Sequence, residues 1–336
     1  EYRCATPVLN FNLGGWTARA SMVTATMNTT GWGTLLVETT GSTGATSGLQ
    51  AYAAGFVEGW ISSEQINLFW LSNQYNPAPK VVDFVNENNA WINANIKNPP
   101  KNDSAGSDAQ TYWSNVEVSM AQLQGLVDGY NLKYAGDRRM QLTYAQLQYL
   151  QLQVELGDIH TAVYPASRPD FMNMTGVELT NYQLKHTHCS ALFKATSSLE
   201  EVYASHVTWS TYTTMVRFMK TYNFPMAGVS ATKVKYSGYP GTLAGIDDFY
   251  ITSQKLAIIE TSNVIYNNSL FDYVNPSTVP YWIRVMVANR IAKNSPEWHD
   301  TFYKYNSGTY NNQWMTFDYK LFEPGYPLKA NTFLVS

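Results

Sequence analysis

The chain contains few cysteines, little charge and no long apolar segment. Only Cys4 and Cys189 among its 336 residues are cysteines, which excludes a framework of several disulfides. Charged residues make up 14%, well below the usual quarter or so. The net charge of −3, without a lysine- or arginine-rich run, argues against a nucleic-acid partner. No apolar run reaches the roughly 18 residues that a transmembrane helix requires, so we expect no membrane-spanning segment.

Aromatic and amide side chains take the place of the missing charge, and 45% of the residues are hydrophobic. A chain of this size can bury a substantial core, as one large domain or two moderate ones. It begins at Glu1 and not at Met, which is the pattern of a chain whose leader has been removed. We therefore expect a lysosomal or secreted protein.

Four Asn-X-Ser/Thr triplets are possible glycosylation sites, at Asn28, Asn102, Asn173 and Asn267. A sequence this rich in asparagine, serine and threonine contains such triplets by chance as well. The triplets therefore permit a secretory route without establishing it.

The first 160 residues have the apolar spacing of helices, with one strand near the start. The strand is expected at Trp32–Thr40, and the helices at Leu49–Ile61, Ser63–Tyr75, Pro79–Ile96, Thr111–Tyr130 and Thr143–Leu156. We expect a mostly helical N-terminal part.

The second half is richer in strand patterns. We expect strands at Ser190–Ala195, Val202–Val207, Val234–Ser237, Asp248–Thr252 and Leu256–Thr261, and helices at Ser210–Tyr222 and Pro280–Ala292. Helices, then strands, then helices is the order expected for an α+β protein whose sheets are covered on both outer faces.

Cys189 lies where three chemically useful side chains should meet. A turn at 196–198 joins the strands 190–195 and 202–207 into a hairpin, so the start of the first strand meets the end of the second. Cys189 stands at that start, and His206 and Trp209 stand at that end. A thiol, an imidazole and an indole are therefore expected to be neighbours.

Three interpretations of Cys189 follow from the residues alone. It could be a nucleophile, because a thiol next to a base or an α-amino group attacks acyl carbonyls. It could be a buried, inert cysteine, since cysteine is among the most buried residue types. It could also be part of a zinc site, in which His186, His188, Cys189 and His206 provide four suitable ligands.

Several blocks of the sequence together resemble the phospholipase B-like family, also called lamina-ancestor-like proteins. The resemblance extends from about Gly31 to the C-terminus in the same order. It rests on the blocks 49–55, 123–126, 188–194, 206–209, 239–242, 247–250 and 306–315, of which the last, Asn-Ser-Gly-Thr-Tyr-Asn-Asn-Gln-Trp-Met, is the most specific.

The resemblance implies an N-terminal-nucleophile hydrolase with an αββα four-layer sandwich. It implies that the precursor cuts itself between His188 and Cys189, giving an N-terminal fragment, 1–188, and the start of the catalytic fragment, 189–336. The family's histidine and tryptophan follow its cysteine by 17 and 20 residues, which His206 and Trp209 match. The resemblance also suggests that Ser262 contributes to an oxyanion hole.

Two departures from the family pattern matter. Ser205 and Val207 replace the alanine and asparagine that usually flank the family's histidine. Family members also continue for roughly two hundred residues beyond Ser336, and the asparagine expected in the oxyanion hole lies there. The catalytic fragment is therefore expected to be incomplete without a C-terminal remainder of the same precursor.

The activity implied is hydrolysis of fatty-acyl esters of phospholipids through a thioester on Cys189, without a metal or organic cofactor. One alternative is an amidase acting on N-acylated or peptide-like substrates, because the same thiol chemistry cleaves both bonds. Another is a non-catalytic glycoprotein that uses the fold for binding.

Overall fold

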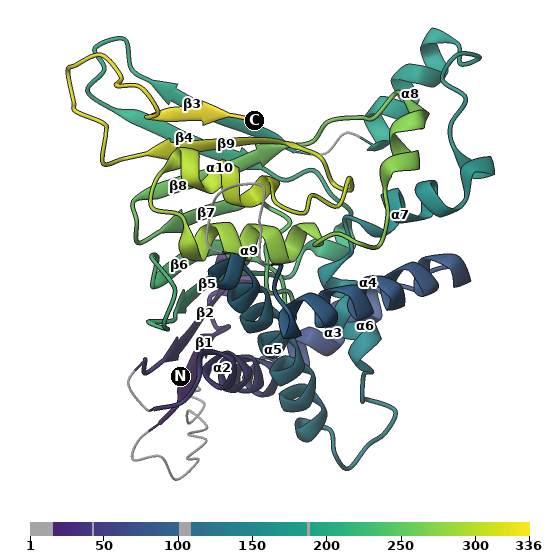
Figure 1. Cartoon of the computed structure of the whole chain (residues 1–336), viewed down its shortest axis with the longest axis vertical. Helices are drawn as coiled ribbons and strands as arrows, with labels where there is room; N and C mark the ends of the chain where they lie inside the picture. The colour runs from purple at the N-terminus through teal and green to yellow at the C-terminus, as the bar shows by residue number, and fades with distance from the viewer. Residues whose placement is uncertain (1–15, 42–43, 101–108, 187–188) are drawn as a thin grey trace.

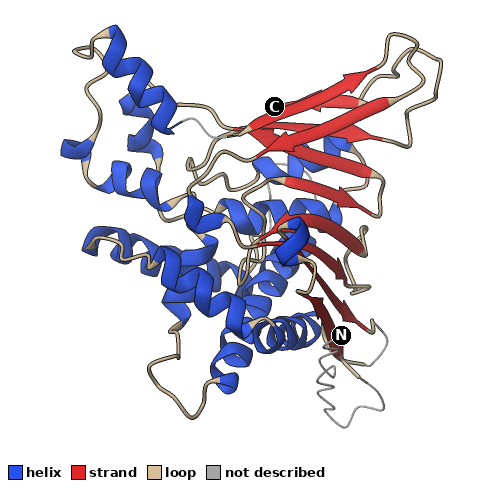
Figure 2. Ribbon diagram, turned by 180° about the vertical axis from the view of Figure 1, so that it is seen from behind, coloured by secondary structure: helices blue, strands red, loops and turns tan. Residues whose placement is uncertain are grey.

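A computed structural model of the chain describes residues 16–41, 44–100, 109–186 and 189–336, with the side chain of His186 excepted. Its main feature is a mixed sheet of eight strands with helices packed along one face (Figures 1 and 2). In sheet order the strands are β1 (Ala18–Val23), β2 (Trp32–Thr39), β5 (Arg217–Asn223), β6 (Lys233–Gly238), β7 (Phe249–Thr252), β8 (Leu256–Thr261), β9 (Gln313–Asp318) and β10 (Phe333–Val335).

Helices make up most of the described residues that precede Cys189, as the sequence predicts. They are α1 (Met27–Thr30), α2 (Ser47–Ile61), α3 (Ser63–Asn73), α4 (Pro79–Lys97), α5 (Ala109–Lys133), α6 (Tyr144–Gln151), α7 (Leu156–Val163) and α8 (Gly176–His186). Two more, α9 (Tyr281–Ile291) and α10 (Ser295–Tyr303), follow the central strands, and short 3₁₀ turns occur at 165–167, 212–214 and 268–273. None of the described helices is both long enough and apolar enough to cross a membrane.

Helices α2 and α5 pack unusually closely through glycines that recur every four residues. Gly55 and Gly59 of α2 face Gly125 and Gly129 of α5. A Cβ atom built on Gly125 would lie 1.9 Å from the carbonyl oxygen of Tyr52, and one on Gly55 equally close to that of Gln122. Because these glycines have no side chain, the two backbones can touch. The pair α2 and α5 is part of the helical layer that covers the sheet.

Strands from both sides of Cys189 belong to the same sheet. β2 pairs with β5 in parallel, with Trp32 opposite Arg217 and Glu38 opposite Asn223. All other neighbours in the sheet are antiparallel. β1 and β2, which precede Cys189, are thus hydrogen-bonded into the same sheet as the strands that follow it.

The predicted hairpin is present and forms a second, two-stranded sheet of β3 (Ser190–Ala195) and β4 (Val202–Val207). It covers the face of the large sheet opposite the helices. Phe193 of β3 stacks on Phe317 of β9, with ring centroids 5.7 Å apart. Trp314 of β9 instead packs against Trp298 of α10, with ring centroids 5.3 Å apart. Since 314 and 317 differ by an odd number, their side chains leave β9 on opposite faces.

The helix predicted at Ser210–Tyr222 is wrong. The chain there forms only the turn at 212–214 and then β5, a central strand between β2 and β6. Phe218, Lys220 and Tyr222 alternate into the core, which is a period of two. The buried Lys220 hides this alternation in the sequence, because only the structure shows that its ammonium group pairs with Glu58 of α2, Nζ to Oε1 2.7 Å.

The α+β class is confirmed, and the strands predicted at 32–40, 190–195, 202–207 and 256–261 are present within a residue of their expected ends. The helix expected at Thr143–Leu156 is α6, which ends early at Gln151; α7 begins only at Leu156 and was not predicted. Strands β1, β9 and β10 were not predicted. In the described part of the chain, the helices, the large sheet and the hairpin form successive layers.

Candidate active site

Cys189 precedes β3 directly and has a backbone conformation that is unusual for its residue type. Its φ is 72°, in the left-handed region that a non-glycine residue adopts at a cost. The hydroxyl of Thr261, at the end of β8, donates a hydrogen bond to the Cys189 carbonyl oxygen, 3.1 Å away. The backbone N–H of Trp209 is directed at the thiol. The hairpin and β8 therefore hold Cys189 from both sides.

His206 is positioned by the alternation of β4. Its side chain points toward the large sheet and is 3% exposed. The Nε2 atom lies 3.5 Å from Oε1 of Glu260, which is the penultimate residue of β8 and is completely buried. On the other side of the ring, Nδ1 lies 3.5 Å from the hydroxyl oxygen of Thr208.

Glu260 was not predicted as a site residue. The sequence does carry a signal, a lone acid in the apolar strand Leu-Ala-Ile-Ile-Glu-Thr, and a buried acid without a cationic partner is a candidate functional group. The thiol of Cys189, a ring nitrogen of His206 and a carboxyl oxygen of Glu260 all lie within 4.8 Å of one another. The histidine and the acid therefore share one small volume with the predicted nucleophile.

Burial determines the protonation of these three groups. It raises the pKa of the Cys189 thiol well above its ordinary value, and the nearby charge of Glu260 raises it further. Burial raises the pKa of Glu260 to about 8, although Asn312 and the thiol, which lie against the carboxyl group, lower it in part. Burial also lowers the pKa of His206, which favours the neutral imidazole. At pH 7 the cluster is therefore predominantly uncharged.

Several buried polar atoms around the thiol have no hydrogen-bond partner of good geometry among the described residues. They include Nε2 of His206, both carboxyl oxygens of Glu260, Oγ of Ser262 and Nδ2 of Asn312. Buried polar atoms are normally hydrogen-bonded, so several unpaired ones in the same place indicate a site where another molecule or chain segment binds. A ligand, water or further protein could provide the missing partners.

A second acidic pair, Asp247 and Asp248, lies beside this cluster and accepts hydrogen bonds from several hydroxyl groups. Thr208 and Tyr239 donate to Oδ1 of Asp247. Tyr281 donates to Oδ1 of Asp248 and Tyr310 to Oδ2. These bonds tie the end of β4 and the strand β7 to the helix α9 and the loop before β9.

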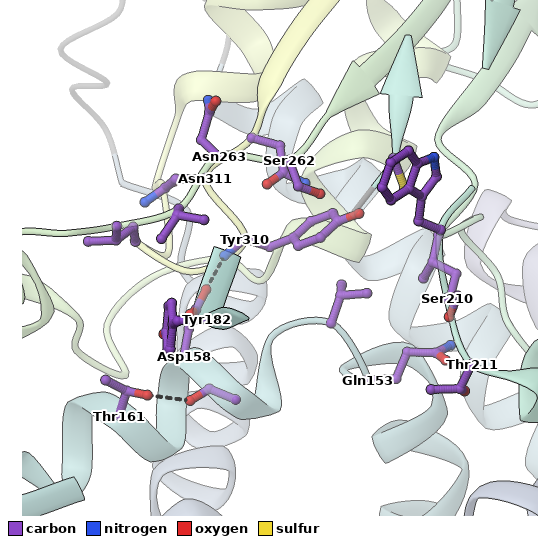
Figure 3. Close-up of a pocket in the computed structure, with 18 of the residues that line it drawn as sticks. Gln153, Asp158, Thr161, Tyr182, Ser210, Thr211, Ser262, Asn263, Tyr310 and Asn311 are labelled. Atoms are coloured by element: carbon purple, nitrogen blue, oxygen red, sulfur yellow. Dashed lines mark hydrogen bonds between the residues drawn. The ribbon is translucent and has the colours of Figure 1, made fainter. Parts of the chain in front are cut away.

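Cys189 opens into a cavity of about 660 Å³. Its walls come from α7 and the turn before it, from α8 and the end of α3, from the loops after β4 and β8, and from the loop before β9. Figure 3 shows the Tyr310 ring reaching across this cavity, with Ser262 and Asn263 above it and Gln153, Ser210 and Thr211 on the far side. Trp209, half exposed, lines the cavity next to Cys189. The volume is in the range of small-molecule binding sites.

The sequence profile of the Phospholipase B family matches residues 18–336. The chain belongs to the phospholipase B family. Curated relatives include phospholipase B-like protein B of Dictyostelium discoideum, 37% identical over 92% of this chain. Phospholipase B-like 1 of Bos taurus is 31% identical over 92% of the chain, and phospholipase-B 81 of Drysdalia coronoides is 34% identical over 88%. The resemblance seen in the sequence is thereby confirmed.

This phospholipase B family chain spans about half the length of the relatives it matches. The matched region covers 54% of the Dictyostelium protein, 56% of the bovine protein and 54% of the Drysdalia protein. The relatives are therefore nearly twice as long as the region that the present site comes from.

The structure brings together the four residues that the sequence proposed for this family's chemistry. Cys189 and His206 belong to one cluster, and Trp209 and Ser262 line the same cavity as Cys189. Their catalytic roles remain predictions. His188, on the other side of the proposed cleavage site, lies outside the described residues.

The remaining predicted sites are placed as follows. Asn28, Asn173 and Asn267 are exposed, as glycosylation requires, whereas Asn102 lies outside the described residues. The zinc hypothesis rests on two histidines, at 186 and 188, whose side chains are also outside them. Among the residues that the structure describes, Cys189, His206 and Glu260 could together provide three donors to a metal ion, whereas a closed zinc site uses four.

Proposed function

We propose that this chain is part of a phospholipase B-like hydrolase that cuts its own precursor between His188 and Cys189 and then uses the Cys189 thiol to cleave fatty-acyl esters of phospholipids. The observation that supports this most is the position of the thiol. It lies at the wall of a ligand-sized cavity, in contact with a buried histidine and a buried acid, on a residue with a strained backbone.

The chemistry of the mature site follows from a free N-terminus at Cys189. The α-amino group, with an ordinary pKa near 8, takes the thiol proton while the sulfur attacks the ester carbonyl. The resulting ammonium returns that proton to the departing alcohol, which leaves a thioester on Cys189. Water then attacks the thioester, releases the fatty acid and restores the thiol.

The other predicted residues have roles that suit their positions. His206 is held neutral by burial and orients the thiol and the amine. Ser262, whose hydroxyl oxygen has no hydrogen-bond partner among the described residues, lines the same cavity and contributes to the oxyanion hole. Trp209 shapes the cavity wall beside the sulfur.

The proposed mature protein has two fragments that stay together. β2 of the first fragment pairs along seven residues with β5 of the second, and Glu58 of α2 forms a buried ion pair with Lys220 of β5. Separation of the two fragments would expose the paired strands and the ion pair to solvent. A cut after residue 188 should therefore leave the two fragments together as one folded particle. We place this particle in the αββα four-layer class, in which the hairpin β3–β4 belongs to the second sheet and the rest of the precursor completes it.

Amide hydrolysis is the second candidate, and the composition of the cavity favours it. Among the described residues that line the cavity, none is a lysine or arginine that could pair with a phosphate group. Of the lining residues that the structure describes, Asp158 alone has a carboxyl group, and burial raises its pKa. An uncharged N-acyl substrate therefore suits these walls better than an anionic headgroup does.

The location proposed for the protein is lysosomal or secreted, in agreement with the exposed Asn28, Asn173 and Asn267. Treatment with a glycosidase that removes N-linked glycans should lower its mass in discrete steps. A protein without any such shift would contradict the secretory route.

Intact-mass analysis with N-terminal sequencing of the full-length precursor tests the proposed function. A fragment that begins Cys-Ser-Ala-Leu is expected from the natural protein, and none from Cys189→Ala. Turnover of matched phospholipid esters and N-acyl amides then separates the two candidates. An uncut precursor at every pH from 4 to 8 would exclude the proposal and favour a non-catalytic binding protein.

A further inference from the structure

Self-cleavage poses a proton-transfer problem that the mature enzyme does not have. Before the cut, the nitrogen of Cys189 is part of a peptide bond and cannot act as a base. The thiol must nevertheless lose a proton, and the amide nitrogen must gain one before it can leave. A group that serves both atoms has to come from elsewhere in the fold.

Glu260 is the described residue whose position meets this need. Its carboxyl group lies within 4.8 Å of the Cys189 thiol and approaches it closely enough to affect its own pKa. The next residue along β8, Thr261, is hydrogen-bonded to the carbonyl oxygen of the same cysteine. The end of β8 is therefore fastened to the residue whose nitrogen becomes the leaving group.

Both oxygens of Glu260 are free to exchange protons. Neither has a hydrogen-bond partner of good geometry among the described residues, although the side chain is completely buried. Asp248, a buried acid of the same region, differs in this respect because tyrosine hydroxyls occupy both of its oxygens. A buried carboxyl group whose two oxygens are not held by hydroxyl donors is suited to accept a proton at one oxygen while donating from the other.

We propose that Glu260, as a neutral carboxylic acid, relays the proton from the Cys189 thiol to the Cys189 amide nitrogen during self-cleavage; this inference rests on the proposed self-cleavage itself. The role differs from that of the α-amino group, which exists only after the cut. Glu260 is thus a catalytic residue of maturation.

The step balances in atoms and charge. In one concerted transfer, the carbonyl-type oxygen of Glu260 takes the thiol proton while its hydroxyl-type oxygen gives its own proton to the Cys189 nitrogen, and the sulfur attacks the carbonyl carbon of residue 188. The protonated nitrogen then leaves as the C–N bond breaks. A thioester and a free amine result, Glu260 is again a neutral acid, and water hydrolyses the thioester to release the fragment that ends at residue 188.

The environment keeps Glu260 in the form that this relay needs. Facing groups that titrate are Cys189, His206, Asp248 and Tyr310. Burial lowers the pKa of the histidine and raises the pKa values of Asp248 and the tyrosine, which favours the uncharged form of each group. With the pKa of Glu260 at about 8, self-cleavage should be fully active below pH 7 and should slow as the pH rises above 8.

Glu260→Gln in the full-length precursor is the direct test, with the cut fraction followed by denaturing electrophoresis and intact mass. The substitution keeps the volume but cannot relay a proton, so the rate of self-cleavage should fall at least 100-fold, which is typical of general acid–base catalysis. The matched control is Asp248→Asn, which changes an adjacent buried acid and keeps a residue that tolerates its φ of 43°. The control should cut within about tenfold of the natural rate.

The outcomes separate the inference from the proposed function. If the natural precursor is never cut, the proposed function fails. If it is cut, Cys189→Ala is not, and Glu260→Gln is cut at the natural rate, only the relay fails. Thermal unfolding of each variant is measured in parallel, and a folded but uncut Glu260→Gln protein supports the relay. If that variant does not fold, the pH profile of the natural precursor decides, since a rate that rises above pH 8 would overturn the relay.

A precursor cut by an external protease isolates the role in maturation. Residues 185–188 are replaced by a factor Xa recognition sequence, so that the protease leaves Cys189 at the new N-terminus. After this treatment the α-amino group of Cys189 is available as the base, so Glu260→Gln should lose far less turnover than self-cleavage. A loss of turnover as large as the loss of self-cleavage would overturn the assignment to maturation.

Discussion

Thr261 donates a hydrogen bond to the carbonyl oxygen of Cys189 across 3.1 Å, and Cys189 has a φ of 72°. The two facts belong together, because a strained backbone persists only where its surroundings hold it. The hydroxyl group at the end of β8 thus fixes the direction in which the hairpin leaves the proposed nucleophile.

Thr261→Val removes this bond while keeping the shape of the side chain. We expect self-cleavage to slow about three- to tenfold, which corresponds to one hydrogen bond of about 0.5–1.5 kcal/mol. The rate constant is measured from the time course of the cut fragments. Thr261→Ser retains the hydroxyl and should cut at the natural rate, and equal rates for Val and Ser would contradict the positioning role.

The buried ion pair between Lys220 and Glu58 gives a stability prediction. The ammonium group donates to Oε1 of Glu58 and to the carbonyl oxygen of Thr242, and Tyr222 donates to Oε2. Lys220→Met leaves the carboxylate buried without its counter-ion and should lower the free energy of unfolding by about 3–5 kcal/mol. Urea denaturation measures the loss. The double variant with Glu58→Gln should be more stable than Lys220→Met alone, and an equal or lower stability would refute this account.

The glycine contact between α2 and α5 should tolerate no side chain. In Gly125→Ala the added Cβ meets the backbone of α2 at 1.9 Å, so the helices must separate at a cost of about 1–3 kcal/mol. Gly136→Ala is the control, since a Cβ there has no neighbour within 4 Å. Thermal melting compares the two variants, and a Gly125→Ala protein as stable as the control would show that the helices are not in contact.

His299 predicts a pH-dependent share of the stability. Its Nε2 atom lies 3.0 Å from the hydroxyl oxygen of Thr316, and burial lowers its pKa to about 4. The unfolded chain therefore binds this proton first as the pH falls from 6.5, so the contribution of His299 is present above pH 6.5 and is lost towards pH 4.

We accordingly expect the stability difference between the natural protein and His299→Gln to shrink by about 2 kcal/mol between pH 7 and pH 4.5, since one pKa unit equals about 1.4 kcal/mol. Unfolding curves at both pH values provide the numbers. A difference that does not change with pH would mean that the histidine is equally basic in the folded and unfolded chain.

The sequence predicted the neighbourhood of Cys189 because that neighbourhood is local. Cys189, His206 and Trp209 meet through one hairpin, and a period of two with a short turn is sufficient to bring its ends together. The helices before Cys189 were predicted for the same reason, since their apolar spacing is a property of consecutive residues.

Glu260 and Thr261 could not be found in this way. They follow Cys189 by more than seventy residues, and only the packing of the hairpin over β8 brings them to it. The strand β5 was missed for a related reason, because its buried lysine looks like a surface residue until Glu58 of α2 is placed beside it.

The sequence by itself determined the family and the α+β class and predicted the nucleophile, since motifs and periodic patterns are written in consecutive residues. The tertiary structure decided which acid faces the thiol, which hydroxyl holds its carbonyl group and which cavity it opens into. These depend on contacts between distant strands, and the free energy of such contacts arises from burial, which no local pattern records.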